Sequence, residues 1–224
     1  FLAWLDEIKH DAQILFLMGD LFDFWHEWKY VVPKGYVRIL GKLAELKDSG
    51  IDIYFFVGNH DLWMKDYLEE EIGIPVFFEK QYYEISGKNF LLAHGDGLGP
   101  GDKGYKRMKK LFTNPIAQWF FKWLHPDIAM KIAVYFSTKN KMISGVEDMK
   151  FLGEDKEFLI LYSKEKLKSE KIDYFVYGHR HLPMILDLKI DENAANYVNL
   201  GDWISYFTYG VFDGAEFKIE EYKQ

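Results

Sequence analysis

The sequence predicts an α/β layered fold, and three observations support this prediction. Short apolar runs recur along the chain, each bounded by turn signals, as expected for strands that are buried on both faces of a sheet. Segments of helical length with one apolar face separate these runs in the first half of the chain. Four of the runs end in a glycine next to a polar side chain, which places those side chains at one edge of a parallel sheet.

The expected elements follow from this pattern. Before the middle of the chain they are helix 1–12, strand 14–18, helix 34–48, strand 51–57, helix 61–71 and strands 74–78, 82–86 and 89–93. Toward the end they are helix 155–169 and strands 173–177, 184–188, 196–200, 206–211 and 216–221. Short turns join these late strands, which favours antiparallel pairing. We expect a single domain over residues 1–224, interrupted by an insertion at about 97–150.

The insertion differs in charge from the rest of the chain. Residues 102–145 contain nine Lys or Arg and two Asp, which gives a local charge of +7 in a chain of net charge −7. Pro115 and Pro126 predict the first turns of two helices. Their apolar residues form a stripe: Ile116, Trp119, Phe120, Trp123, Leu124, Ile128, Ile132 and Phe136. The helices form either a buried hairpin, or an apolar groove or membrane-facing cap that is flanked by cations and suits an amphiphile with an anionic head.

Composition limits the chemistry of any site. The hydrophobic fraction of 49% is ample for a core, and without cysteine a metal would be held by imidazole, carboxylate and amide groups. No apolar run is long enough to cross a bilayer and no signal peptide is recognisable, so we expect a soluble protein. The acidic balance outside the insertion argues against nucleic acid as a partner.

The four glycine-containing strand ends carry side chains that bind metals. In chain order they read Gly-Asp, Gly-Asn-His-Asp, His-Gly-Asp and Gly-His-Arg-His. Each motif alone is weak, because a single histidine is more often structural than a ligand. Their combination, each after a buried-type strand, predicts a metal centre.

These blocks resemble those of the calcineurin-like metallophosphoesterases over nearly the whole chain. The resemblance implies a layered αββα sandwich with an inserted helical cap, and two divalent ions, with Mn²⁺ the most expected. It implies that Asp20 bridges the ions, that Asn59, His94 and His179 complete one site, and that His181 belongs to the other.

Two departures from the family pattern affect this interpretation. No Asp-x-His block, which would supply two ligands to the second ion, precedes Asp20. We expect that its strand lies upstream of the sequence given, and that the chain as written holds one ion well and the other poorly. The second departure is His60, where the subfamily considered next often has Arg.

His60 and Asp61 are the expected catalytic residues. The resemblance implies that His60 donates to the phosphoryl or leaving-group oxygen, while Asp61 orients its ring and favours the protonated form. Asp61 also fits the N-cap of the helix that follows. Asp23 is interpreted as a supporting residue or a cap.

The insertion narrows the substrate. GDLFDFW and HGDGLGPGDKGYKRMKKLFTNP resemble the UDP-2,3-diacylglucosamine hydrolases of lipid A biosynthesis. The resemblance implies cleavage of the pyrophosphate of a lipid-linked sugar nucleotide, giving UMP and 2,3-diacylglucosamine 1-phosphate. It further implies a cytoplasmic enzyme, peripheral to the inner membrane of a Gram-negative bacterium. The implied substrate contacts are Asp102, Tyr105, Ser137, Asn140 and Lys141.

Some assignments stay open at this stage. Trp119, Phe120, Trp123 and Phe136 are candidates for an acyl pocket, with core packing expected for at least half of them. Trp25 and Trp28 either contact substrate or fill the loop after Asp20, and His10, His26 and His125 are interpreted as surface or capping residues. The alternative functions are hydrolysis of nucleotide or cyclic-nucleotide phosphodiesters, and a non-catalytic scaffold.

Overall fold

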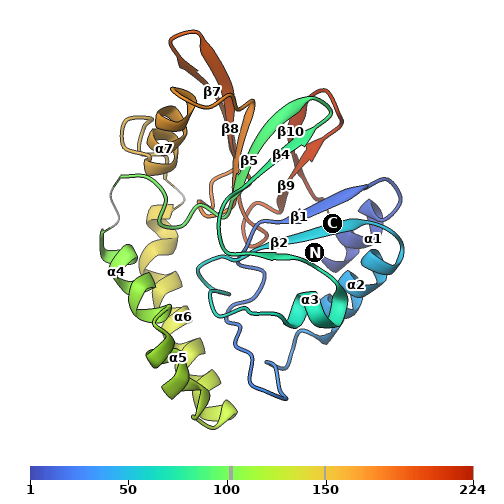
Figure 1. Cartoon of the computed structure of the whole chain (residues 1–224), viewed down its shortest axis with the longest axis vertical. Helices are drawn as coiled ribbons and strands as arrows, with labels where there is room; N and C mark the ends of the chain where they lie inside the picture. The colour runs from blue at the N-terminus through green and yellow to red at the C-terminus, as the bar shows by residue number, and fades with distance from the viewer. Residues whose placement is uncertain (101–102, 149, 224) are drawn as a thin grey trace. The chain divides into compact units, whose positions relative to one another are not determined.

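The computed structural model describes residues 1–100, 103–148 and 150–223, with only the helical backbone for residues 103–104 and 138–148. The contacts within the chain divide it into two compact units. The first unit comprises Phe1–Glu79 and Arg107–Asn140, and the second comprises Lys80–Lys106 and Lys141–Gln224. Element labels follow Figure 1.

The first unit is built on a parallel three-stranded sheet in the order β1-β2-β3. Its strands and connecting helices are α1 (Leu2–Ile8), β1 (Ile14–Leu17), α2 (Val37–Asp48), β2 (Asp52–Phe56), α3 (Tyr67–Ile72) and β3 (Val76–Phe77). The parallel pairing places the ends of β1 and β2 side by side, because Leu17 pairs with Phe55. The predicted elements are confirmed, except that α3 begins at Tyr67 rather than near residue 61.

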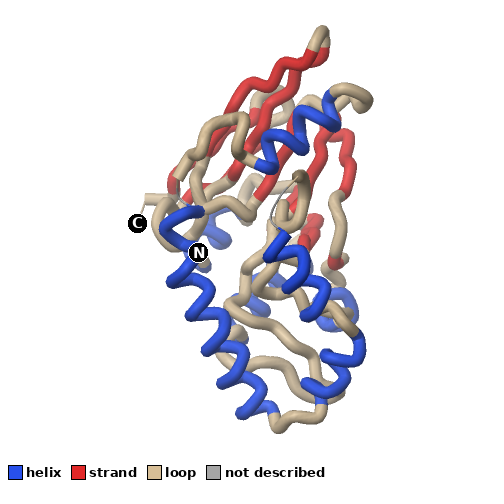
Figure 2. The backbone as a smooth tube through the Cα atoms, turned by 90° about the vertical axis from the view of Figure 1, so that its left-hand side faces the viewer, coloured by secondary structure: helices blue, strands red, loops and turns tan. Residues whose placement is uncertain are grey.

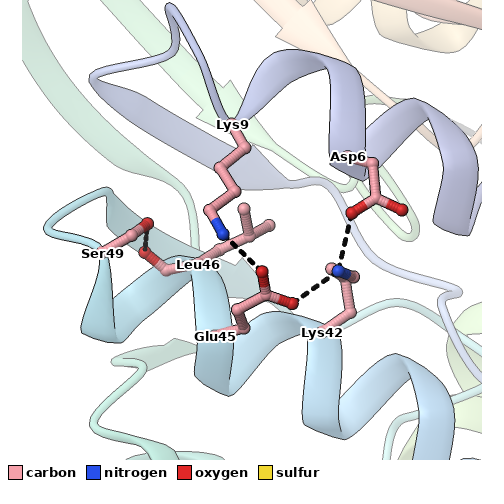
Figure 3. A network of polar contacts seen from close by, with 6 residues as sticks. All are labelled: Asp6, Lys9, Lys42, Glu45, Leu46 and Ser49. Atoms are coloured by element: carbon pink, nitrogen blue, oxygen red, sulfur yellow. Dashed lines mark hydrogen bonds and ion pairs between the residues drawn. The ribbon is translucent and has the colours of Figure 1, made fainter.

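A network of charged side chains joins α1 to α2 (Figure 3). Lys42 donates to Asp6 (2.7 Å) and to Glu45, and Lys9 at the end of α1 also donates to Glu45. These two donors lower the pKa of Glu45 to about 2, so its carboxylate stays charged at mildly acidic pH. The network is exposed to solvent and therefore contributes little to stability.

Aromatic side chains pack around the loop that follows β1. Trp25 is completely buried and contacts the rings of Phe22, Tyr36 and Tyr67. Its indole N–H donates to Glu27 (2.9 Å). Trp25 therefore packs the loop after Asp20, which was one of its two predicted roles.

The second unit contains a five-stranded sheet in the order β4-β5-β6-β8-β7. The strands are β4 (Gln81–Ile85), β5 (Lys88–Ala93), β6 (Tyr174–Tyr177), β7 (Met184–Ile190) and β8 (Asn193–Asn199). The central strands β5, β6 and β8 are parallel, whereas β4 and β7 pair antiparallel at the edges. A separate antiparallel pair follows, β9 (Thr208–Phe212) with β10 (Phe217–Glu221).

The predicted antiparallel pairing of late strands joined by short turns is confirmed for β7 with β8 and for β9 with β10. The short turn between β7 and β8 gives the predicted antiparallel hairpin, but β8 then lies between β7 and β6 and runs parallel to β6. Local turn chemistry determines the hairpin, whereas the second neighbour of β8 depends on which apolar face meets the core. Helix α7 (Phe158–Leu167) packs on β7 and β8 and buries Leu159 and Ile160.

The insertion forms α4 (Lys103–Phe112), α5 (Pro115–Lys122) and α6 (Pro126–Asp148), the longest helix in Figures 1 and 2. Both prolines occupy the first helical position, as predicted, and the Asn114 side chain caps α5 by accepting from Ile116 N–H (2.9 Å). Helix α4 was not predicted. Among the described residues no helix is long and apolar enough to cross a membrane.

The apolar stripe of α5 and α6 faces solvent. Trp123 is 74% exposed, Phe120 64% and Trp119 54%, and Ile116, Leu124, Ile128, Ile132 and Phe136 are exposed as well. The buried-hairpin interpretation is therefore wrong, and so is the expectation that at least half of the candidate acyl-pocket residues pack in a core. The inward face instead carries Ala129 and Ala133, which are buried, and the partly buried Phe121. The small side chains of Ala129 and Ala133 allow close packing on this face of α6, and the large rings lie on the exposed face.

Candidate active site

The loops after β1 and β2 approach each other closely in the first unit. Asp20 has φ +56° and follows Gly19 with φ +91°, so the chain leaves β1 in a left-handed turn. A Cβ at Gly58 would lie 2.3 Å from Asp20 Oδ1 and 2.6 Å from the Asp20 nitrogen. Only glycine fits at this position, which explains the Gly-Asn-His-Asp motif physically.

Carboxylates hold these two loops together. Asp20 Oδ1 accepts the His60 N–H (2.8 Å), while the buried Asp61 accepts from Gly58 N–H (2.5 Å) and from Leu21 N–H (3.1 Å). The His60 and Leu21 bonds join the two loops, and the Gly58 bond closes the second loop on itself. Asn59 and His60 are therefore presented beside Asp20. Asp61 does not cap α3, whose N-cap residue is Asp66, and the capping interpretation is wrong. Its predicted effect on the His60 ring stays a prediction.

The His60 ring is held from a different direction. His60 Nδ1 lies 3.1 Å from Ser137 Oγ and 3.3 Å from the Asp23 carbonyl oxygen. Ser137 Oγ itself donates to the same carbonyl (3.0 Å). All three residues belong to the first unit, and Ser137 is supplied by α6 of the insertion.

Two imidazoles converge in the second unit. His94 follows β5 and His179 follows the neighbouring parallel strand β6, and the N–H groups of Gly178 and His179 donate to the His94 carbonyl (3.0 and 2.8 Å). As a result His179 Nδ1 lies 3.2 Å from His94 Nε2. Two nitrogens bound to one ion at about 2.1 Å are about 3.0–3.4 Å apart, so this pair fits adjacent ligands of a single metal.

His181 has a carboxylate neighbour that the motifs did not reveal. Its Nδ1 lies 3.6 Å from Asp202 Oδ2, and Asp202 Oδ1 accepts backbone N–H bonds from residues 204–206. A carboxylate beside one ring nitrogen favours a proton there and directs the other nitrogen toward a metal. The signal for Asp202 was present in the sequence, since NYVNLGD is a fifth apolar strand ending in Gly-Asp.

A second missed residue is Asp96, the last member of the His-Gly-Asp block. It is buried and accepts from the hydroxyl of Tyr105 on α4 (2.6 Å). Tyr105, a predicted substrate contact, is thereby held close to His179, with ring centroids 6.1 Å apart. Asp102, another predicted contact, lies outside the described residues, as do the side chains of Asn140 and Lys141.

Buried Arg180 separates the two histidines of the last motif. It donates to Glu157 (3.0 Å) and to the Lys150 carbonyl (2.6 Å). Glu157 is the N-cap residue of α7 and also accepts from Leu152 N–H (3.1 Å). This ion pair attaches the segment that follows the insertion to the Gly-His-Arg-His turn.

The predicted role of His26 is wrong. It was interpreted as a surface or capping residue, but its side chain is buried against Trp28, Trp63 and Phe121, with centroid distances of 4.5, 5.4 and 5.2 Å. Neither ring nitrogen has a hydrogen-bond partner among the described residues. Burial, helped by the positive charges of Lys65 and Lys122, lowers its pKa from 6.5 to about 4.

The other two histidines behave as predicted: His10 is exposed, and His125 Nδ1 accepts from Asp127 N–H (3.3 Å) at the start of α6.

The predicted metal ligands are thus found in two sets. Asp20 and Asn59 share the loop cluster of the first unit, and His94 and His179 form the imidazole pair of the second. Within the described residues, no three His, Asp or Glu side chains are grouped so that they alone could hold a metal. The meeting of all five predicted donors stays a prediction.

Comparisons with known proteins identify the family. The model of the calcineurin-like phosphoesterases matches residues 1–183. The chain belongs to the calcineurin-like phosphoesterase family. Members of this family are hydrolases that use divalent metal ions, and the observed mixed α/β architecture agrees with their fold.

Relatives within this family are similar over most of their length. A UDP-2,3-diacylglucosamine hydrolase of Porphyromonas gingivalis is 40% identical, covering 97% of this chain and 87% of its own. Proteins of the same name from Edwardsiella ictaluri and Yersinia pestis are 28% and 26% identical, each over 91% of this chain and over 77% and 82% of their own.

Proposed function

We propose that this phosphoesterase hydrolyses the pyrophosphate bond of UDP-2,3-diacylglucosamine, giving UMP and 2,3-diacylglucosamine 1-phosphate. The observation that carries the proposal is the 40% identity to a protein of that name over 97% of the chain. Such similarity includes the insertion, the part of the chain in which substrate specificity is expected. We further propose that residues 1–224 form one domain, with the helices at about 97–150 as its cap.

We propose as metal ligands the five side chains that the motifs predict. Asp20, Asn59, His94 and His179 would hold one divalent ion, and Asp20 and His181 would contribute to a second, with Mn²⁺ as the preferred metal. When bound, such ions lower the pKa of a coordinated water and neutralise charge on phosphoryl oxygens. The donor chemistry supports this, because imidazole nitrogens 3.2 Å apart and a carboxylate in a glycine-lined turn suit a metal of intermediate softness.

The chain's own groups have distinct tasks in this reaction. His60 donates a proton or a hydrogen bond to the phosphoryl or leaving-group oxygen. Asp61 fixes the turn that presents His60, because its two oxygens accept the Gly58 and Leu21 amides. Asp202 orients His181 through its Nδ1.

The cap is proposed to bind the lipid part of the substrate. Its exposed Trp119, Phe120 and Trp123 offer apolar surface for acyl chains, and the basic residues of α4 and α5 suit phosphate groups. Sequence resemblance assigns sugar, nucleotide and phosphate contacts to five cap residues: Asp102, Tyr105, Ser137, Asn140 and Lys141.

We propose that the same surface brings the enzyme to the cytoplasmic face of the inner membrane of a Gram-negative bacterium. Aromatic side chains on α5 and α6, next to Lys122 and Lys131, resemble an interfacial helix that meets anionic lipid. Peripheral association of this kind requires no membrane-spanning helix.

Release of UMP from UDP-2,3-diacylglucosamine in the presence of Mn²⁺ tests the function. The proposal predicts turnover that chelation abolishes and Mn²⁺ restores. The matched comparison is an aryl phosphodiester without acyl chains. His60, the residue found in general phosphoesterases, favours a nucleotide phosphodiester as the second candidate. Rapid turnover of simple diesters together with no UMP release would support that candidate and overturn the first.

A further inference from the structure

Three polar atoms form a closed triangle around the inner side of the His60 ring. His60 Nδ1 is 3.1 Å from Ser137 Oγ and 3.3 Å from the Asp23 carbonyl, and Ser137 Oγ is 3.0 Å from that carbonyl. Among the described residues, these hydrogen-bond contacts of the ring all involve Nδ1. The proton positions in this triangle decide which nitrogen of His60 serves the substrate.

Only one arrangement of protons satisfies all three contacts. A carbonyl oxygen accepts and never donates, so the serine hydroxyl must give its single proton to Asp23. The lone pairs of Ser137 Oγ then face His60 Nδ1, which must carry a hydrogen. In the opposite arrangement Ser137 would donate to a bare Nδ1, and the lone pair of Nδ1 would face the Asp23 oxygen at 3.3 Å. That arrangement forms one hydrogen bond and creates one repulsion.

We propose that Ser137 is a positioning residue that keeps a proton on His60 Nδ1 and directs Nε2 toward the reacting phosphate. The inference rests on the proposed function and deepens it by naming the ring atom that meets the substrate. The hydrogen bond at one ring nitrogen determines the tautomer and hence the chemistry of the other nitrogen. With Nδ1 in contact with Ser137 and Asp23, Nε2 is the ring nitrogen that meets the substrate.

The position of Ser137 in the cap makes the contact informative. Spacings of four residues place Ser137 on the same face of α6 as the buried Ala129 and Ala133. The inward face of the helix therefore ends in a hydroxyl at the point where it meets the histidine. Through this hydroxyl the helix that carries the exposed aromatic face is bonded to the catalytic ring, 77 residues away in the sequence.

The tautomer of His60 is measured directly by long-range ¹H–¹⁵N NMR of the histidine rings in metal-free, full-length protein, with His60→Gln to assign the signal. Wild type is expected to show Nδ1–H for the neutral ring. Ser137→Ala should lower the share of Nδ1–H, because only the longer contact to the Asp23 carbonyl (3.3 Å) remains, and Ser137→Thr, which keeps the hydroxyl, should restore it. Thr113→Ala is the matched control, because it removes another hydroxyl-to-carbonyl bond (2.8 Å) from the cap.

Kinetics separate positioning from substrate binding. Ser137→Ala should lower kcat on the order of 10-fold, with KM nearly unchanged, both for UMP release and for an aryl phosphodiester. A raised KM with unchanged kcat and an unchanged tautomer would leave Ser137 only the substrate contact that the resemblance assigns to it, and would overturn the positioning role. So would an Nε2–H tautomer in the wild type. If the wild type released no UMP but hydrolysed the aryl diester normally, the proposed substrate would be wrong. The role of Ser137 would then be tested on the diester.

Discussion

The first unit holds its site residues with backbone amides, whereas the second unit carries them on neighbouring parallel strands. In the first, Asp20 and Asp61 accept N–H bonds from the loops that they organise. In the second, the carbonyl of His94 accepts two N–H groups, while His179 Nδ1 lies 3.2 Å from His94 Nε2. Carboxylates bonded to amides are stable without a metal, but facing imidazole nitrogens need a proton or a cation between them. We therefore expect the first set to keep its geometry without a metal, and the second to depend on one.

The largest loss of activity is expected at Gly58, where the two loops of the first set are in closest contact. Gly58→Ala places a Cβ 2.3 Å from Asp20 Oδ1, so Asp20 or its loop must move. We expect kcat/KM to fall on the order of 1,000-fold, which is about 4 kcal/mol of transition-state stabilisation. Steady-state assays of the variant check this. Gly41→Ala is the control, because nothing lies within 4 Å of its new Cβ, and normal activity of Gly58→Ala would contradict the close approach.

The ion pair between Arg180 and Glu157, next to the histidines of the second set, is tested by substitution of Arg180. Arg180→Met leaves buried Glu157 without its charged partner, and we expect about 3–4 kcal/mol lower unfolding free energy in urea. Combining it with Glu157→Gln should recover much of this loss, because the uncompensated charge is removed. If the single and double variants unfold alike, the ion pair does not hold the Gly-His-Arg-His turn.

His26 belongs to neither set, and its burial predicts an acid sensitivity of its own. Its pKa of about 4 in the folded state is below the ordinary 6.5, so the unfolded chain binds the proton first. Stability contributed by the neutral ring is complete above about pH 6.5 and falls as the pH drops toward 4, by roughly 2–3 kcal/mol. His26→Leu should therefore lose less stability than wild type between pH 7 and pH 4.5. The exposed His10→Leu is the matched control, and equal losses in wild type and His26→Leu would contradict the burial of a neutral ring.

The smallest effect on stability is expected on the cap. Trp119→Ser and Trp123→Ser remove exposed rings, so unfolding should change by less than about 0.5 kcal/mol. KM for the diacylated substrate should rise about 10-fold while the aryl phosphodiester is unaffected. Equal effects on both substrates would assign these residues to something other than acyl binding.

Much of the fold was predictable because its signals are local. Apolar runs ended by glycine located β1, β2, β5 and β6 to within a residue or two, and the prolines located the starts of α5 and α6. The same logic placed Asp20, Asn59 and His94 at strand ends.

The errors concern contacts between distant residues. The burial of His26 depends on Phe121, which lies almost a hundred positions away and outside the predicted apolar stripe. Hydrophobicity predicted core packing for at least half of Trp119, Phe120, Trp123 and Phe136, yet all four are exposed while Ala129 and Ala133 are buried. The triangle of Asp23, His60 and Ser137 likewise joins three separate segments, and no spacing in the sequence encodes it.

The proposed metal site requires that Asn59 and His179 bind the same ion, and a double-variant cycle of Mn²⁺ affinity tests this most directly. Asn59→Ala removes a ligand of the first set and His179→Ala one of the second, and isothermal titration gives the Mn²⁺ affinity of each variant and of the double variant. A shared ion predicts that either change alone weakens the tight site strongly and that the second change adds little. Two separate binding events, each weakened by one variant and fully additive in the double variant, would contradict the account.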